Sequence, residues 1–121
     1  KDKANHIRSW ATFYIGQVDF DNKNIREALW NRINDKHQET RMEAIIGLAK
    51  RKDDRVFEII NQELTENDFG SMLFEAILET ENKDFIPILQ QELNKSKNIE
   101  TINPDWIKEL EKCIDDLTKL E

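Results

Sequence analysis

Apolar residues recur every three or four positions along most of this chain, and polar turns separate the apolar stretches. The pattern is clearest over residues 39–64, where Ala44 and Leu48 lie on one side of a first segment and Val56 and Ile60 on one side of a second. This spacing is typical of amphipathic helices, and the Asp residues between the two segments are suited to cap the second helix. The same spacing predicts helices over about 4–18, 23–34, 37–51, 54–66, 83–95 and 104–119, and one that begins near residue 67 or 68.

The helical pattern also repeats along the chain. Residues 41–49 align with 8–16 at an offset of 33, and residues 56–64 align with 85–93 at an offset of 29 and with 25–33 at an offset of 31. Two helices in each unit of about 30 residues are the signature of an α-solenoid. We therefore predict an all-α fold, a right-handed α-solenoid of about three antiparallel helix pairs with a C-terminal capping helix. The single domain, residues 1–121, is expected to hold units at about 4–35, 37–66 and 68–95 and the cap at about 104–119.

Both prolines fit the beginnings of helices. Pro87 falls in the first turn of a predicted helix, where a missing N–H costs little, and Pro104 follows Asn103, a good N-cap residue. The last helix then has an apolar stripe that includes Leu110 and Leu117, opposite a charged face. One apolar and one polar face is what a terminal cap requires.

The first helix differs from the later ones. We expect Ile7, Ala11, Ile15 and Val18 to form its buried stripe, with Ala11 equivalent to Ala44 and Ala76 as a small residue that lets a neighbouring helix approach closely. Its other side is also apolar, because Trp10 occupies the position of Glu43 and Glu75, and Tyr14 that of Gly47 and Glu79.

Three interpretations of this aromatic side remain open. It packs on an upstream repeat, it pairs two chains, or residues 1–6 fold back and cover it. The first agrees with our expectation that the sequence, which starts at Lys1 without an initiator Met, is a piece of a longer chain. A monodisperse monomer in light scattering would exclude the second.

The stretch ETRMEAIIGLAKRKDDRVFEIINQEL (39–64) resembles the HEAT repeat, in particular the short bacterial HEAT-like type also found in phycobilin lyase-related proteins. The likeness spans about residues 6–95, and its third unit diverges at Leu73 and Thr80. It implies a stack of helix pairs but no particular function, because such repeats serve many partners. The residues that carry it are Arg41, Ala44, Gly47, Leu48, Asp53 and Val56, with Arg8, Ala11, Ile15 and Gly16 in the first unit.

Composition narrows the range of functions. The formal net charge of −7 disfavours nucleic acid as a partner, and no apolar run is long enough to span a membrane. The sequence therefore indicates a protein of the cytoplasm with neither a nucleic-acid nor a membrane partner, although a targeting segment could precede Lys1. Residues 56–84 carry 8 acidic side chains against 1 basic, which indicates a solvated face or a surface that attracts a basic partner. A basic cluster at Lys50, Arg51, Lys52 and Arg55 is explained by a charged corner between helices.

No catalytic motif is present, and we expect neither an enzyme nor a cofactor. His6 and His37 lie near helix starts without Cys or a second His nearby, so solvent exposure explains them better than a metal site. Cys113, the only cysteine, lies on the apolar stripe of the last helix and is expected to be a small core residue.

A binding surface is implied by the resemblance, since the second helices of HEAT-like pairs line the concave side of the stack. Trp30 would anchor a partner there, or it would simply cover the turn at 19–24. The candidate partner-binding residues are Arg26, Trp30, Asn31, Asn61, Gln62, Gln90, Gln91 and Asn94.

The sequence favours a non-enzymatic scaffold that binds a protein partner of unknown identity, as a monomer or as a dimer through the first helix. One alternative is a HEAT-like enzyme or enzyme subunit, related to chromophore lyases or, with less support from the acidic charge, to DNA glycosylases. Another is an acidic inhibitor or immunity module.

Overall fold

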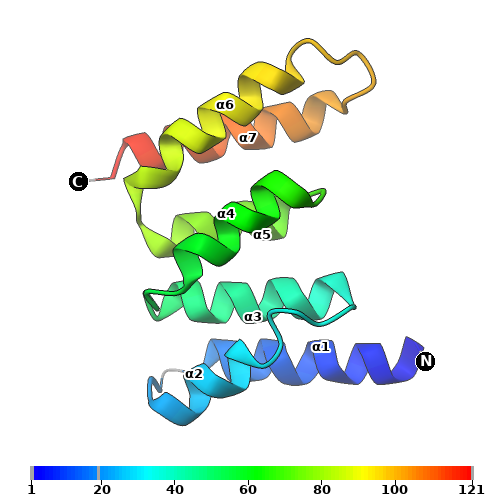
Figure 1. The fold of residues 1–121 in the computed structure, drawn as a ribbon, viewed down its shortest axis with the longest axis vertical. Helices are drawn as coiled ribbons and strands as arrows, with labels where there is room; N and C mark the ends of the chain where they lie inside the picture. The colour runs from blue at the N-terminus through cyan, green and yellow to red at the C-terminus, as the bar shows by residue number, and fades with distance from the viewer. Residues whose placement is uncertain (1, 19, 121) are drawn as a thin grey trace.

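The computed structural model describes residues 2–18 and 20–120, and all regular secondary structure in these ranges is helical. The predicted all-α class is therefore confirmed (Figure 1). The elements are α1 (Asp2–Gln17), α2 (Lys23–Trp30), α3 (Gln38–Lys50), α4 (Val56–Glu66), α5 (Ser71–Thr80), the short 3₁₀ helix η1 (Lys83–Phe85), α6 (Ile86–Ser96) and α7 (Pro104–Thr118).

The odd-numbered helices form a row. α1 packs on α3, α3 on α5 and α5 on α7, while α2, α4 and α6 lie alongside this row (Figure 1). α1 and α7 lie towards opposite ends of the long axis. α3 is the central element, because it contacts α1, α2, α4 and α5.

Apolar side chains from both sets of helices form one core. α3 contributes most, with Ala44, Ile45, Leu48 and Ala49 all fully buried. Burial of these side chains is the main force that holds short helices together, because helices of 8 to 16 residues are marginal on their own. The other fully buried apolar residues are Leu29, Ile60, Leu73, Ala76, Ile77, Phe85, Leu89, Leu110 and Leu117.

Most helix boundaries lie close to the predicted ones, with two exceptions. α2 ends at Trp30, four residues early, because the N–H groups of Arg32 and Ile33 turn back to the carbonyl groups of Leu29 and Trp30. α5 begins at Ser71 instead of residue 67 or 68, with Gly70 at its N-cap position.

The predicted helix starts at the two prolines are confirmed. Pro87 lies in the first turn of α6, and Pro104 opens α7 behind Asn103, whose side-chain oxygen accepts the N–H of Asp105 at 2.8 Å. Trp106 fixes the start of α7, since its indole N–H donates to the carbonyl of Phe69 at 2.7 Å.

The predicted buried stripe of α1 is wrong. Ile7 and Ala11 are exposed, Ile15 and Val18 are half-buried, and the face turned towards α3 instead carries the small residues Ser9, Thr12 and Gly16. Ala11 is therefore not equivalent to Ala44 and Ala76, which are fully buried. The reason is close approach of the helix backbones: a Cβ built on Gly47 would lie 3.0 Å from the Cα of Gly16, which leaves no room for large side chains.

The suggestion that residues 1–6 fold back over α1 is also wrong for residues 2–6. Residues 2–6 continue α1 as its first turns, and the aromatic side of the helix stays exposed. Lys1 lies outside the described residues, as do Asp19 and Glu121.

Arginines link successive parts of the chain. Arg8 pairs with Asp35 through two bonds of 2.9 and 3.0 Å, and Arg41 pairs with Glu63 through bonds of 3.0 and 3.3 Å. Arg51 lies at the end of α3, and its side chain is only 5% exposed. Its two terminal nitrogens donate to the carbonyl oxygens of Ile15, Gly16, Val18, Phe20 and Gly47 at 2.8 to 3.2 Å.

Candidate functional site

The predicted surface on the even-numbered helices is only partly available for binding. Arg26 is held by Asp21 at 2.7 and 2.8 Å, by Asp53 at 3.3 Å and by the carbonyl of Arg51 at 2.9 Å. These contacts, with Asp21 the largest cause, raise the pKa of Arg26. Trp30 is half-buried against the core, and the guanidinium carbon of Arg55 lies 4.3 Å from the centre of its ring. Both residues thus have structural contacts that the sequence pattern did not indicate.

The amide side chains of this surface reach solvent without forming a common pocket. Gln62 donates to Glu66 at 3.0 Å and lines a polar hollow with Arg41 and Glu63, whereas Asn61 is half-buried. The amides that are exposed are Asn31, Gln62, Gln90, Gln91 and Asn94.

The basic side chains at the end of α3 form hydrogen bonds and ion pairs within the molecule. Lys50 donates to Gln17 at 2.7 Å, Lys52 donates to the carbonyl of Glu79, and Arg55 pairs with Asp53 at 2.9 Å. Lys50, Arg51 and Lys52 thus link neighbouring helices and Arg55 stabilises the turn before α4, as expected for a charged corner between helices.

The exposed apolar surface of the molecule is concentrated on α1 and just beyond it. Trp10 is 53% exposed, Phe13 40% and Tyr14 68%, and Ile7 and Phe20 are exposed as well. We call Trp10, Phe13 and Tyr14, which all lie on α1, the α1 aromatic surface. Clustered exposed apolar side chains of this size mark sites of interaction, because burying them releases free energy.

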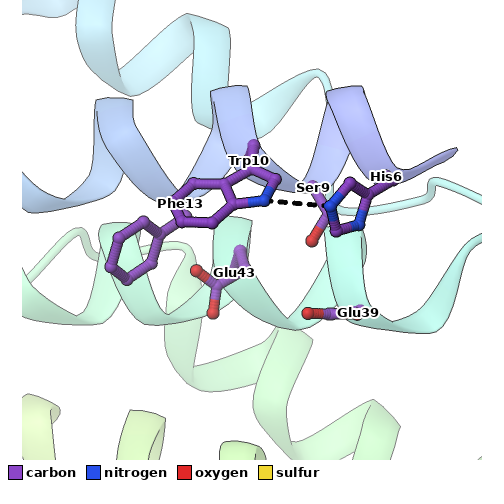
Figure 2. A pocket seen from close by; sticks show the side chains of 6 residues that line it. All are labelled: His6, Ser9, Trp10, Phe13, Glu39 and Glu43. Carbon is purple, nitrogen blue, oxygen red and sulfur yellow. Dashed lines mark hydrogen bonds between the residues drawn. The ribbon is translucent and has the colours of Figure 1, made fainter. Parts of the chain in front are cut away.

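A groove runs between this surface and α3. It has a volume of about 320 Å³ and is lined by His6, Ser9, Trp10 and Phe13 from α1 and by Glu39 and Glu43 from α3. We call it the α1–α3 groove. Figure 2 shows Glu39 and Glu43 of α3 on the side of the groove opposite His6, Trp10 and Phe13 of α1.

Contacts within α1 fix the aromatic wall of the groove. The indole N–H of Trp10 donates to Nε2 of His6 at 3.1 Å (Figure 2). The rings of Trp10 and Phe13 meet edge to face, with centres 5.9 Å apart and planes at 90°. Two rings oriented in this way form a preorganised apolar wall.

The opposite wall is electrostatically strained. Burial raises the pKa of Glu43, and the neighbouring carboxylates of Glu75 and Glu39 raise it further, with only Lys50 opposing them. Among the described residues, no Lys or Arg forms an ion pair with Glu39, Glu43 or Glu75. This wall therefore favours a positively charged ligand.

The sequence pattern contains one signal for this groove. Trp10 stood out as an aromatic residue at a position where the later units carry Glu43 and Glu75. The pattern did not indicate that Glu43 would itself lie opposite Trp10.

The remaining residues considered from the sequence are Cys113 and His37. Cys113 is buried, as predicted, and burial raises the pKa of its thiol to about 12. His37 begins α3, with Nδ1 2.9 Å from the hydroxyl of Thr40. In the part of the chain that the structure describes, no three His, Cys, Asp or Glu side chains gather closely enough to hold a metal ion. Nor does any helix there combine the length and apolar character needed to cross a bilayer.

Comparison with known proteins finds similarity to part of one bacterial protein, in sequence and in fold. No family model matches the chain. Over 102 residues, which are 84% of the chain, it is 38% identical to protein YibA of Escherichia coli K12, and it matches YibA of Escherichia coli O157:H7 equally well. The chain spans only 36% of the length of these curated relatives.

A solved structure gives the same result in three dimensions. The crystal structure of Escherichia coli YibA matches 94% of this chain with a TM-score of 0.73 and 33% identity, and the matched part is 39% of that structure. The chain is therefore similar in sequence and fold to part of YibA, whose name specifies no activity.

Proposed function

We propose that this chain is a segment of a right-handed α-solenoid of the HEAT-like type, and that it binds a protein partner without catalysing a reaction. The solenoid is supported by the row of α1, α3, α5 and α7 with the other helices packed alongside. It is also supported by the contact pattern, in which helices close in sequence pack together, as stacked repeats require.

The α1 aromatic surface is the observation that carries the protein-binding function. Exposed aromatic side chains are enriched at the centres of protein interfaces, where they account for much of the binding energy. Trp10 and Tyr14 are each more than half exposed, although Trp10 and Phe13 also line the groove beside α3. The closest contact of α1 with α3 is made by small residues such as Gly16, so the packing of the two helices does not explain the size of the aromatic residues.

The amide-rich surface of α2, α4 and α6 is a second place where the partner could contact the chain. Trp30 is its only large apolar side chain among the candidate residues, and that side chain is already partly buried against the core. We therefore place the main anchor on α1 and assign the exposed amides a supporting role.

The acidic side chains on α3 and α5 favour an inhibitor module as a second candidate function. The carboxylates of Glu39 and Glu75 both interact electrostatically with the carboxylate of Glu43. The three charges give this side of the molecule a negative electrostatic field. Such a surface suits a protein that covers a basic site on a target. Loss of the target's activity on addition of this chain would distinguish an inhibitor from a passive scaffold.

Affinity capture from a nuclease-treated lysate of the source cells tests the proposed function. Wild type is compared with W10A/Y14A, with W30A, and with T101A as a control at an exposed position outside both candidate surfaces. A protein retained by wild type and T101A but lost with a folded W10A/Y14A would support binding through α1. Equal retention by W10A/Y14A would contradict it, and selective loss with W30A would move the site to the surface of the even-numbered helices.

Light scattering of the same samples separates a partner from self-association. A dimer of wild type that becomes a monomer in W10A/Y14A would show that the α1 aromatic surface pairs two copies of the chain. A monomer in both would leave the surface free for a different protein.

A further inference from the structure

We propose that the α1–α3 groove binds an arginine or lysine side chain from a basic segment of the protein partner. This inference rests on the proposed function and assigns the partner its chemistry. It follows from the shape of the groove, the charge of one wall and the aromatic character of the other.

The size of the groove fits a single long side chain. At about 320 Å³ it lies at the lower end of the range of ligand pockets, roughly 300–1,000 Å³, and it is open towards the exposed face of α1. A partner that covered the α1 aromatic surface would place its side chains directly above this opening, because Trp10 and Phe13 belong to both.

The wall on α3 selects for positive charge. Glu39 and Glu43 are four residues apart on one helix, so their like charges lie close together and repel each other. Glu75 on α5 adds to this repulsion, and the pKa of Glu43 is raised first by burial and then by the charges of Glu75 and Glu39. A cation that enters the groove would relieve the repulsion, whereas a phosphate or a carboxylate would increase it.

The wall on α1 favours a cation that has an apolar stem. Arg and Lys bind the faces of aromatic rings through the ring electrons and bury their methylene groups against apolar surface. Trp10 and Phe13 offer ring surface beside the carboxylates, and the bond from Trp10 to His6 holds the indole in place. The two walls therefore match the two halves of one arginine or lysine side chain.

Titration with short peptides tests this assignment directly. The probe is a blocked peptide of about twelve residues in which arginine and alanine alternate, and the readout is the NMR signal of the Trp10 indole N–H. A peptide with glutamate in place of arginine serves as the charge control. We compare wild type with E39Q/E43Q and with E109Q/E111Q, a matched loss of two charges at exposed positions of α7.

The expected result is a saturable shift of the Trp10 signal with the arginine peptide but not with the glutamate peptide. The affinity should fall about tenfold or more in E39Q/E43Q and less than about twofold in E109Q/E111Q. No shift with the arginine peptide, or equal losses in the two double variants, would overturn the proposal. Since the peptide experiment needs no natural partner, its result is independent of the capture experiment: a partner retained through Trp10 without arginine binding would refute only the basic chemistry.

Discussion

Replacement of Arg51 by methionine is expected to destabilise the protein more than removal of any exposed charge. Methionine keeps much of the length and the apolar stem of the side chain but removes the guanidinium group. In wild type that group donates to five carbonyl oxygens, four of them at or just beyond the end of α1. Without Arg51, these carbonyls lose the donor that joins the end of α1 to α3.

The size of the effect follows from two opposing contributions. The two terminal nitrogens carry four N–H groups, so the five contacts include a shared one. Four hydrogen bonds from a charged donor, at about 1.5 kcal/mol each, contribute roughly 6 kcal/mol. Against this stands the cost of removing the charge from water, several kcal/mol for a side chain that is 5% exposed, and this burial lowers the pKa of Arg51. The remainder is about 2–4 kcal/mol, which for a chain of this length corresponds to a fall in melting temperature of roughly 6–15 °C.

Urea denaturation followed by circular dichroism measures this loss. R51K should lie between wild type and R51M, because one ammonium group cannot reach all five carbonyl oxygens. R32M is the control, since the side chain of Arg32 is 48% exposed and 3.9 Å from Asp35, and it should change the free energy of unfolding by less than about 0.5 kcal/mol. A free energy of unfolding for R51M within about 1 kcal/mol of wild type would refute the reasoning.

Other positions give separate tests. Ala44→Leu should cost about 1–3 kcal/mol in urea denaturation through overpacking, and no loss would mean that the core around Ala44 is loosely packed. Trp30→Ala should cost about 1–2 kcal/mol in thermal unfolding, whereas a loss above about 3 kcal/mol would identify a core residue rather than a partner anchor. The side chain of Arg8 lowers the pKa of Asp35 from 3.8 to about 2. The stability that Arg8→Met removes should therefore be fully present above about pH 4 and disappear as the pH falls through 2. A difference in unfolding free energy between wild type and Arg8→Met that does not depend on pH would argue against the ion pair. Because burial raises the pKa of Cys113 to about 12, a thiol reagent at pH 8 should label the folded protein at least about a thousandfold more slowly than the unfolded protein, and rapid labelling would show that the site opens.

The middle of the chain was predictable because its apolar pattern and its packing agree. In α3, the residues spaced for burial, including Ala44, Ile45 and Leu48, are those that the core encloses. The end of α2 was harder to predict, since Ile33 continues the helical spacing and is buried, yet the chain reaches it through a tighter turn. Apolar periodicity records which side chains are buried but not the hydrogen bonds of the last turn.

In α1, apolar pattern and packing disagree. The stripe expected from Ile7 and Ala11 is exposed, because contact with α3 requires residues smaller than those that usually indicate a core, such as Ser9 and Gly16. The same rotation of the helix brings Trp10 above Glu43, and so the α1–α3 groove could not be foreseen until the buried face of α1 was known.

The contact between Gly16 and Gly47 ties these two positions to Arg51, and we expect the three to change together in related sequences. One terminal nitrogen of Arg51 donates to the carbonyls of both glycines, at 3.0 and 2.8 Å, and it reaches both because the two backbones lie so close together. A methyl group added to either glycine would move α1 away from α3 and withdraw one carbonyl from the arginine. Related sequences that have lost one glycine should therefore also have replaced the arginine. Either substitution alone should destabilise the contact between α1 and α3, so the two changes are expected together.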